Sequence, residues 1–282
     1  MKVFATRAAM AAASSRWSKN GESIGFVPTM GALHDGHASL IRRARRENRR
    51  VVVSVFVNPK QFGPNEDYGV YPRSFPADKA LCRRFGADAV YHPGVAQVYP
   101  GGFSTAVDVG GASQPLEGRF RPGFFRGVAT VVLKLFETVR PTRAYFGEKD
   151  YQQLTVIRRL ARDLDLDVAV VGCPTVRDRD GLALSSRNRY LAGSERLAAP
   201  RIYKALALGR RLAGRRGTTA SWLVAQVRRA ILAGIPTAKI DYVSLADAST
   251  LRPALRLEGR LRLLAAVRVG STRLIDNIPI SC

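Results

Sequence analysis

The chain has 282 residues, of which 46% are hydrophobic and 24% charged, and its formal net charge at pH 7 is +23. These values are typical of a globular protein with one large domain or two, and no apolar run approaches the roughly 20 residues that span a bilayer. The basic excess is mostly arginine, and its clusters at residues 42–50 and 210–216 contain no aromatic residues. Because single-stranded nucleic acids stack on aromatic side chains, we expect solvated helix faces and no nucleic-acid partner.

The N-terminal stretch MKVFATRAAMAAASSRW is rich in small apolar residues, but Arg7 interrupts it early. This pattern favours a short strand followed by a helix over a signal peptide. The three cysteines, Cys82, Cys173 and Cys282, are widely spaced and form no CxxC pair. Such spacing is typical of a protein in a reducing cytoplasm, and no membrane partner is expected.

Strand-like and helix-like segments alternate up to about residue 176. The strand candidates are short, nearly continuous apolar runs, as in parallel strands covered on both faces. They lie at residues 24–28, 51–57, 87–91, 143–146 and 168–172. The helix candidates lie between them, at residues 38–48, 77–85, 128–139 and 152–164. This rhythm predicts an α/β domain over residues 1–176 with a doubly wound parallel sheet.

The pattern changes after residue 176. Residues 194–215 and 218–233 read as two long amphipathic helices, with Ser194 and Thr218 as their N-caps. Three strand-like runs follow, and turn residues between them indicate hairpins. These runs lie at residues 240–245, 261–269 and 272–275. We therefore expect a smaller α+β domain over residues 177–282 that could act as a lid.

Two histidines lie three residues apart in His34-Asp35-Gly36-His37, between the first strand and the first long helix of the predicted sheet. Amide groups at a helix N-terminus attract anions, and Gly36 allows backbone and phosphate to approach closely. The imidazoles can donate hydrogen bonds to a phosphate as charge develops on it. The segment therefore predicts a nucleotidyl-transfer site, although a turn whose histidines merely cap the helix would give the same pattern.

Four separate segments follow the ends of predicted strands. They are marked by His34, Asn58, Gly147 and Thr175. Ligands of doubly wound sheets bind beyond the carboxyl ends of the strands, so we expect these four segments to meet at one crevice.

The second of these segments is FVNPKQF, in which Asn58 and Gln61 could recognise a hydroxyl or a carboxylate. A turn held by asparagine and proline is the alternative. The third is GEKDYQQ, in which Lys149 can hold phosphate and Asp150 can cap a helix or hold hydrated Mg²⁺, with Gln153 one turn further on. Its alternative is a capped helix with a surface lysine.

The fourth segment is DGLALSSRN, in which Ser185, Ser186 and Arg187 form a plausible triphosphate clamp. A linker with a helix cap would have the same residues. A fifth segment, EGRFRPGFFRGV, brings Arg121 and Arg126 near a helix start, and by itself it indicates little.

Together the segments PTMGALHDGH, FVNPKQF, RPGFFRGV, FGEKDYQQL and DGLALSSRN resemble, in order and spacing, those of the pantothenate synthetase (pantoate–β-alanine ligase) family. The similarity runs from about Gly25 to Asn277. The resemblance implies a Rossmann-type domain with a HIGH-type nucleotidyltransferase signature, a smaller C-terminal domain and a cytoplasmic homodimer. It also implies ATP, Mg²⁺, pantoate and β-alanine as ligands, in the pathway to coenzyme A.

The resemblance assigns roles residue by residue. The catalytic positions are His34, His37, Lys149 and Arg187. The ATP-binding positions are Met30, Gly31, Ala32, Leu33, His34, Asp35, Gly36, His37, Gly147, Glu148, Lys149, Asp150, Val176, Leu184, Ser185, Ser186 and Arg187. Pantoate and β-alanine are assigned to Gln61, Gln153, Asn58 and Arg121, and Mg²⁺ to Asp150 through the ATP phosphates.

One position departs from the family pattern, because Phe124 stands where a histidine is usual. His92 lies outside all the motifs, and we interpret it as structural.

The reaction that the resemblance implies has two steps: pantoate attacks the α-phosphorus of ATP, and β-alanine then attacks pantoyl adenylate and releases AMP. No side-chain nucleophile is needed, because the carboxylate and the amine are nucleophiles themselves. Two other interpretations differ in class. A nicotinamide-mononucleotide-type adenylyltransferase would show no pantoate-dependent exchange, and an RNA-binding protein would bind RNA with a steep salt dependence.

Overall fold

A computed structural model describes residues 1–64 and 66–281, so Cys282 lies outside the described residues. Its larger sheet contains six parallel strands in the order β1-β4-β3-β2-β5-β6. From edge to edge these strands are Lys2–Phe4, Ala89–Tyr91, Arg50–Val55, Ile24–Thr29, Arg143–Gly147 and Ala169–Cys173. Most of the inner strand residues are buried, as their nearly continuous apolar sequences predict.

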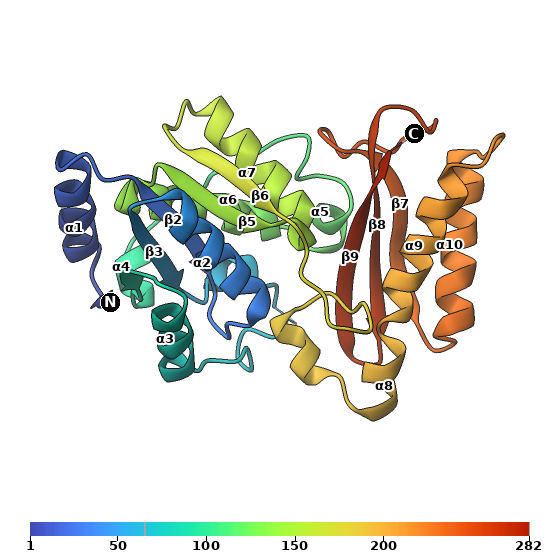
Figure 1. Ribbon diagram of the computed structural model, residues 1–282, viewed down its shortest axis with the longest axis horizontal. Helices are drawn as coiled ribbons and strands as arrows, with labels where there is room; N and C mark the ends of the chain where they lie inside the picture. The colour runs from blue at the N-terminus through green and yellow to red at the C-terminus, as the bar shows by residue number, and fades with distance from the viewer. Residues whose placement is uncertain (65, 282) are drawn as a thin grey trace.

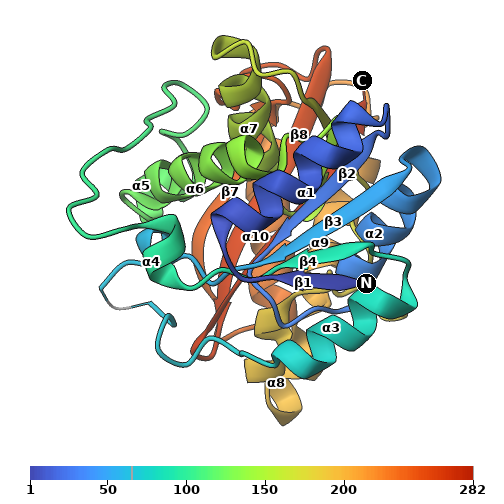
Figure 2. The ribbon, with the colours of Figure 1, turned by 90° about the vertical axis from the view of Figure 1, so that its left-hand side faces the viewer.

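Helices cover both faces of this sheet (Figure 2). One face carries α2 (Asp35–Glu47) and α3 (Phe75–Arg84), which pack on a core that includes Val53 and Tyr145. The other face carries α1 (Arg7–Lys19), α6 (Phe124–Val139) and α7 (Tyr151–Asp163). The chain changes faces between β4 and β5, so the order reverses where β2 and β5 lie side by side. The predicted doubly wound α/β fold is confirmed, and β2 and β5 form its switch point.

The second sheet is antiparallel and contains β7 (Lys239–Asp247), β8 (Arg260–Val269) and β9 (Thr272–Ser281). Figure 1 shows α9 (Arg201–Ala213) and α10 (Ala220–Gly234) packed along one side of it. Their apolar side chains form a separate core with the inner faces of the strands. The predicted smaller α+β unit is therefore present, with β9 six residues longer than expected (281 against 275).

Two details of this second part were predicted wrongly. The expected helix over residues 194–215 is two helices, α8 (Gly193–Ala198) and α9, separated at Ala199 and Pro200. Proline cannot continue a helix by hydrogen bonding but is well suited to begin one. The N-caps are Ala192 and Thr219 in place of Ser194 and Thr218, and the Thr219 side chain accepts from the Trp222 amide.

Short elements complete the described chain, and several of them lie beside the candidate site. They are α4 (Val95–Val98), α5 (Glu117–Phe120) and the 3₁₀ turns η1 (Pro59–Gln61), η2 (Glu148–Asp150) and η3 (Ser186–Tyr190). Among the described helices, none is long and apolar enough to cross a membrane.

Candidate active site

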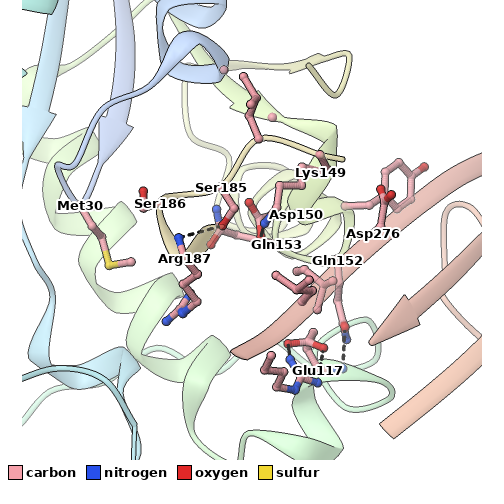
Figure 3. Close-up of a pocket in the computed structure, with 18 of the residues that line it drawn as sticks. Met30, Glu117, Lys149, Asp150, Gln152, Gln153, Ser185, Ser186, Arg187 and Asp276 are labelled. Atoms are coloured by element: carbon pink, nitrogen blue, oxygen red, sulfur yellow. Dashed lines mark hydrogen bonds and ion pairs between the residues drawn. The ribbon is translucent and has the colours of Figure 1, made fainter. Parts of the chain in front are cut away.

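A cavity of about 460 Å³ lies beyond the carboxyl ends of β2 and β5, where it is also lined by residues of β9. His34, Asn58, Gly147 and Thr175 all line it. The four segments expected at one crevice therefore meet there, although they are far apart in the sequence. Figure 3 shows Ser185, Arg187, Asp150 and Gln153 gathered in the middle of this cavity.

The loop from β2 to α2 has a backbone shape that a buried carboxylate holds. Gly31 and Ala32 have φ values of +84° and +50°. The amides of Ala32 and Leu33 donate to the two carboxylate oxygens of Asp78 at 3.1 and 2.7 Å. Asp78 comes from α3 and is buried, so this side chain, which the sequence analysis did not single out, positions the start of α2.

The two histidines cap α2 and also line the cavity. The Gly36 amide donates to His34 Nδ1 at 3.1 Å, and the His34 amide donates to His37 Nδ1 at 3.3 Å. Because a backbone amide can only donate, each neutral ring carries its proton on Nε2. Capping and ligand binding are therefore compatible: the Nδ1 atoms hold the helix, and the Nε2–H groups are donors on the opposite side of each ring.

Both rings favour the neutral form. Burial, followed by the nearby Lys149 ammonium, lowers the pKa of His34 to about 4. Burial and the charges of His34 and Lys149 lower the pKa of His37 well below its usual value. The ring centroids are 4.2 Å apart, so two cations at this distance would repel each other. At neutral pH the pair is two uncharged hydrogen-bond donors beside one ammonium group.

Asn58 and Gln61 have different places in the second segment. The Asn58 amide donates to Gln61 Oε1 at 3.0 Å and to the Gly127 carbonyl at 3.1 Å, and its oxygen accepts from the Tyr99 hydroxyl at 2.8 Å. Asn58 is therefore occupied by the protein, and it orients the Gln61 amide at the cavity wall. Gln61 Nε2 faces the Met30 sulfur at 3.0 Å, which is a weak acceptor.

The two adjacent glutamines of α7 also differ. Gln152 is buried, accepts from the Glu117 amide at 3.0 Å and donates to the carbonyls of Ala112 and Pro115 at 2.8 and 2.7 Å. Gln153, like Gln152, lines the cavity, but its side chain has no hydrogen-bond partner among the described residues. Figure 3 shows Gln153 beside Asp150, so the amide available to a ligand is that of Gln153.

Lys149 and Asp150 lie in η2, directly after β5. Lys149 Nζ is 3.5 Å from Asp150 Oδ1, and both side chains line the cavity. No group of three or more potential metal-ligating His, Cys, Asp or Glu side chains occurs in the described residues. Asp150, with a side chain 46% exposed, supplies one carboxylate. One carboxylate together with phosphate oxygens is a common magnesium environment, so the donor set fits Mg²⁺ bound with a nucleotide.

Two arginines of the site form paired contacts with carboxylates of one loop. Arg187 donates to Asp67 at 3.0 and 2.8 Å. Burial alone would lower the Arg187 pKa, but the Asp67 pair outweighs it and the pKa is raised. Arg121 donates to Glu66 through two 2.6 Å hydrogen bonds. Both guanidinium groups are thus held at the cavity wall by paired hydrogen bonds.

Phe124 stands under one of these arginines. The Arg121 guanidinium lies 3.7 Å from the centroid of the Phe124 ring. A phenyl face favours a cation at this distance. Phe124, which stands where the family pattern has a histidine, therefore supports the Arg121 side chain.

The remaining assigned residues divide into two groups. Met30, Gly36, Val176, Leu184 and Ser185 line the cavity. Ser186 also lines it, and its hydroxyl donates to the Ala32 carbonyl at 3.2 Å. Five assigned positions are not among the lining residues and belong to its supporting backbone or surroundings: Gly31, Ala32, Leu33, Asp35 and Glu148.

His92 lies apart from the cavity residues. Its Nδ1 contacts the Val55 carbonyl at 2.7 Å, and its ring stacks on Phe75 with a centroid distance of 4.0 Å. These contacts agree with its interpretation as a structural residue.

Sequence comparison shows which family contains this chain. The family described as Pantoate-beta-alanine ligase matches residues 2–279. The chain belongs to the pantoate–β-alanine ligase family. A pantothenate synthetase of Cereibacter sphaeroides is 52% identical over 279 residues, which cover 99% of each chain. Another from Rhizorhabdus wittichii is 52% identical over 261 residues, covering 93% of this chain and 92% of the relative.

Solved structures of the pantoate–β-alanine ligase family have the same fold. The pantothenate synthetase of Thermus thermophilus has a TM-score of 0.93 and 49% identity, with 99% of each chain covered. The pantoate–β-alanine ligase of Francisella tularensis, solved with βγ-ATP and β-alanine, has a TM-score of 0.80 and 35% identity, covering 99% of this chain and 97% of the other. The predicted family and ligase class are therefore confirmed.

Proposed function

We propose that this protein condenses pantoate with β-alanine to pantothenate, with ATP consumed through a pantoyl-adenylate intermediate and AMP and pyrophosphate released. The observation that carries the proposal is the cavity itself. Two neutral histidine donors and the Lys149 ammonium share it with the amides of Gln61 and Gln153. Family membership and the ATP and β-alanine bound by the Francisella relative support the same reaction.

In the first half-reaction, the pantoate carboxylate attacks the α-phosphorus of ATP. Gln61 of η1 and Gln153 of α7 together orient pantoate. His34 and His37 donate through Nε2 to oxygens of the transferring phosphate, and Lys149 supplies a positive charge beside them. Arg187, with Ser185 and Ser186, stabilises the pyrophosphate that leaves.

In the second half-reaction, the amine of β-alanine attacks the acyl carbon of pantoyl adenylate, and AMP leaves. The new C–N bond is an amide, the bond between the acyl carbon and the AMP oxygen breaks with its electron pair on AMP, and the proton lost by the amine passes to water. Arg121, supported by Phe124 and Glu66, is the cation that we assign to the carboxylate of a substrate. Asn58 acts through Gln61, because its own amide is already occupied.

The other expected ligands fit the same scheme. Mg²⁺, bound by Asp150 and the ATP phosphates, would neutralise part of the triphosphate charge. The ATP-binding set extends over residues 30–37, residues 147–150, Val176 and residues 184–187. In that set Glu148 supports the loop that carries Lys149.

We also propose the organisation that the family resemblance implies. Residues 1–176 form the ATP- and pantoate-binding domain, and residues 177–282 form a lid that shields the water-sensitive adenylate. The protein acts as a homodimer in the cytoplasm. Analytical ultracentrifugation tests the dimer, for which a sedimenting mass near the 30.8 kDa of one chain would be the contrary result.

Isotope exchange tests the proposed reaction. Labelled pyrophosphate should enter ATP in the presence of pantoate and Mg²⁺ without β-alanine, because adenylation precedes amine attack. A requirement for β-alanine would overturn the two-step scheme. Exchange that nicotinamide mononucleotide supports and pantoate does not would identify an adenylyltransferase of the other kind.

A further inference from the structure

The loop that carries Lys149 is held from the second sheet. Asn277 of β9 donates from Nδ2 to the carbonyl oxygens of Glu148 and Lys149, at 3.0 and 2.9 Å. Asn277 is buried, with an exposed fraction of 4%. Both donors of one side-chain amide are thus used on two successive carbonyls of η2.

Arg262 of β8 fixes the orientation of that amide. Its Nε donates to Asn277 Oδ1 at 2.8 Å, and its Nη2 donates to Glu148 Oε2 at 2.7 Å. The same guanidinium lies 3.9 Å from the centroid of the Tyr151 ring, at the first residue of α7. A reversed Asn277 amide would set its oxygen against two carbonyl oxygens and its nitrogen against Arg262, so only one orientation is satisfied.

The contact between Arg262 and Glu148 is not an ordinary surface ion pair, because Arg262 is buried. Arg262 has a side chain only 7% exposed, while Glu148 is 32% exposed. A buried guanidinium with hydrogen bonds to an amide and a carboxylate is costly to move, because any unpaired charge would remain away from water. Lys149 is held through its backbone, which leaves its ammonium group directed to the cavity that it lines.

We propose that Asn277 and Arg262 are positioning residues for Lys149, and that the C-terminal sheet therefore completes the adenylation site. This inference rests on the proposed function and extends it to residues that no motif of the first domain contains. In Figure 3, Lys149 lies on the same side of the cavity as Asp276, the neighbour of Asn277 on β9. If the second sheet separated from η2, the backbone that sets the Lys149 position would lose these contacts.

Asn277→Asp is the sharpest test, because it keeps the size of the side chain and the contact with Arg262 but removes both donors to the carbonyls. We expect pantoate-dependent pyrophosphate exchange to fall about 10- to 100-fold, the scale of a displacement near 1 Å in a catalytic group. Attack of β-alanine on supplied pantoyl adenylate should keep a near-normal rate. Ile278→Val, at the next buried position of β9, is the matched control and should leave exchange unchanged.

A double-mutant cycle separates positioning from general damage. In a Lys149→Ala background, Asn277→Asp should reduce single-turnover adenylate formation no further, because the group that it positions is absent. Reductions that multiply in the double variant, or an unchanged exchange rate in Asn277→Asp, would overturn the inference. If Asn277→Asp does not fold, Arg262→Gln can take its place in the same cycle, provided that circular dichroism shows this variant to be folded.

Failure of the proposed function would look different. The wild-type protein would then show no pantoate-dependent exchange at all. If the wild-type protein shows exchange but the effects of Asn277→Asp and Lys149→Ala multiply, the proposed reaction stands. Only the positioning role of Asn277 and Arg262 would then be refuted.

Discussion

At the scale of single residues, hydrogen bonds separate side chains that are available to a ligand from side chains that the protein itself occupies. Asn58 and Gln152 are buried, and their amides are occupied by the protein, whereas Gln153 is available at the cavity. The histidine pair belongs to both groups, because Nδ1 caps α2 while Nε2 remains a donor. A mutation of Gln152 should therefore change the stability of the protein, whereas a mutation of the adjacent Gln153 should change ligand binding.

Loss of a phosphate donor should affect the first half-reaction. His37→Ala and Lys149→Ala should each lower single-turnover formation of pantoyl adenylate by roughly 10²–10³-fold, as for other donors aimed at developing charge. Supplied pantoyl adenylate should largely bypass the defect. The control is His92→Asn, which keeps a donor near the Val55 carbonyl and should keep near-normal exchange. Wild-type adenylate formation in His37→Ala would contradict the assignment.

The glutamines allow a second prediction with a matched partner. Gln61→Ala and Gln153→Ala should raise the KM for pantoate about 5- to 150-fold and change the KM for ATP little, since a lost polar contact is worth about 1–3 kcal/mol. Gln152→Ala should instead lower the free energy of unfolding and leave the KM for pantoate near normal. Steady-state kinetics and urea denaturation distinguish the two patterns. Equal changes in both KM values would remove the pantoate assignment.

At the scale of elements, the start of α2 depends on the protonation of the histidines that cap it. A protonated ring would place a hydrogen on Nδ1, where His34 accepts from the Gly36 amide. It would also place a positive charge at the positive end of the helix dipole. The stability of this element is therefore linked to pH.

The sign of that linkage follows from the lowered pKa. His34 has a pKa of about 4 in the folded protein, against 6.5 for an ordinary histidine. Between these values the unfolded chain binds more protons, so the free energy of unfolding falls as pH decreases from about 6.5 to about 4, by up to about 3 kcal/mol. Urea denaturation at several pH values measures this loss. His34→Asn replaces the Nδ1 acceptor of the N-cap with a side-chain oxygen that does not titrate, so it should reduce this loss. An unchanged pH dependence would contradict the prediction.

At the scale of the whole molecule, buried ion pairs join the two sheets around the cavity. Glu117 of α5 accepts from both terminal nitrogens of Arg273 on β9, at 2.7 and 2.8 Å, and from the Tyr242 hydroxyl at 2.9 Å. Arg177, at the start of the second part of the chain, pairs with Asp276 of β9 at 2.6 and 2.8 Å. These contacts fix the position of the second sheet at the cavity that its residues help to line.

Breaking one of these pairs should destabilise the assembled molecule. Glu117→Gln leaves Arg273, whose side chain is 15% exposed, with Asp241 as its one charged partner among the described residues, so we expect a loss of about 3 kcal/mol and a Tm lower by roughly 6–12 °C. Thermal denaturation followed by circular dichroism measures the change. The exposed pair of Arg256 and Glu258 is the control, because Glu258→Gln should shift Tm very little. Similar shifts in both variants would show that burial of the pair is unimportant.

The sequence by itself determined the α/β fold, the family and the segments that form the cavity. Those features are local: apolar runs mark buried strands, and polar residues such as His34 and Lys149 follow the strand ends at which ligands of parallel sheets bind. Helix boundaries were less accurate, since Pro200 divides a helix whose apolar pattern continues across it. Only the tertiary structure decided which residues support the site. Asp78, Glu117, Arg262 and Asn277 act on partners 15 to 156 positions away. The spacing of residues along the chain does not encode such contacts, because only folding brings these side chains together.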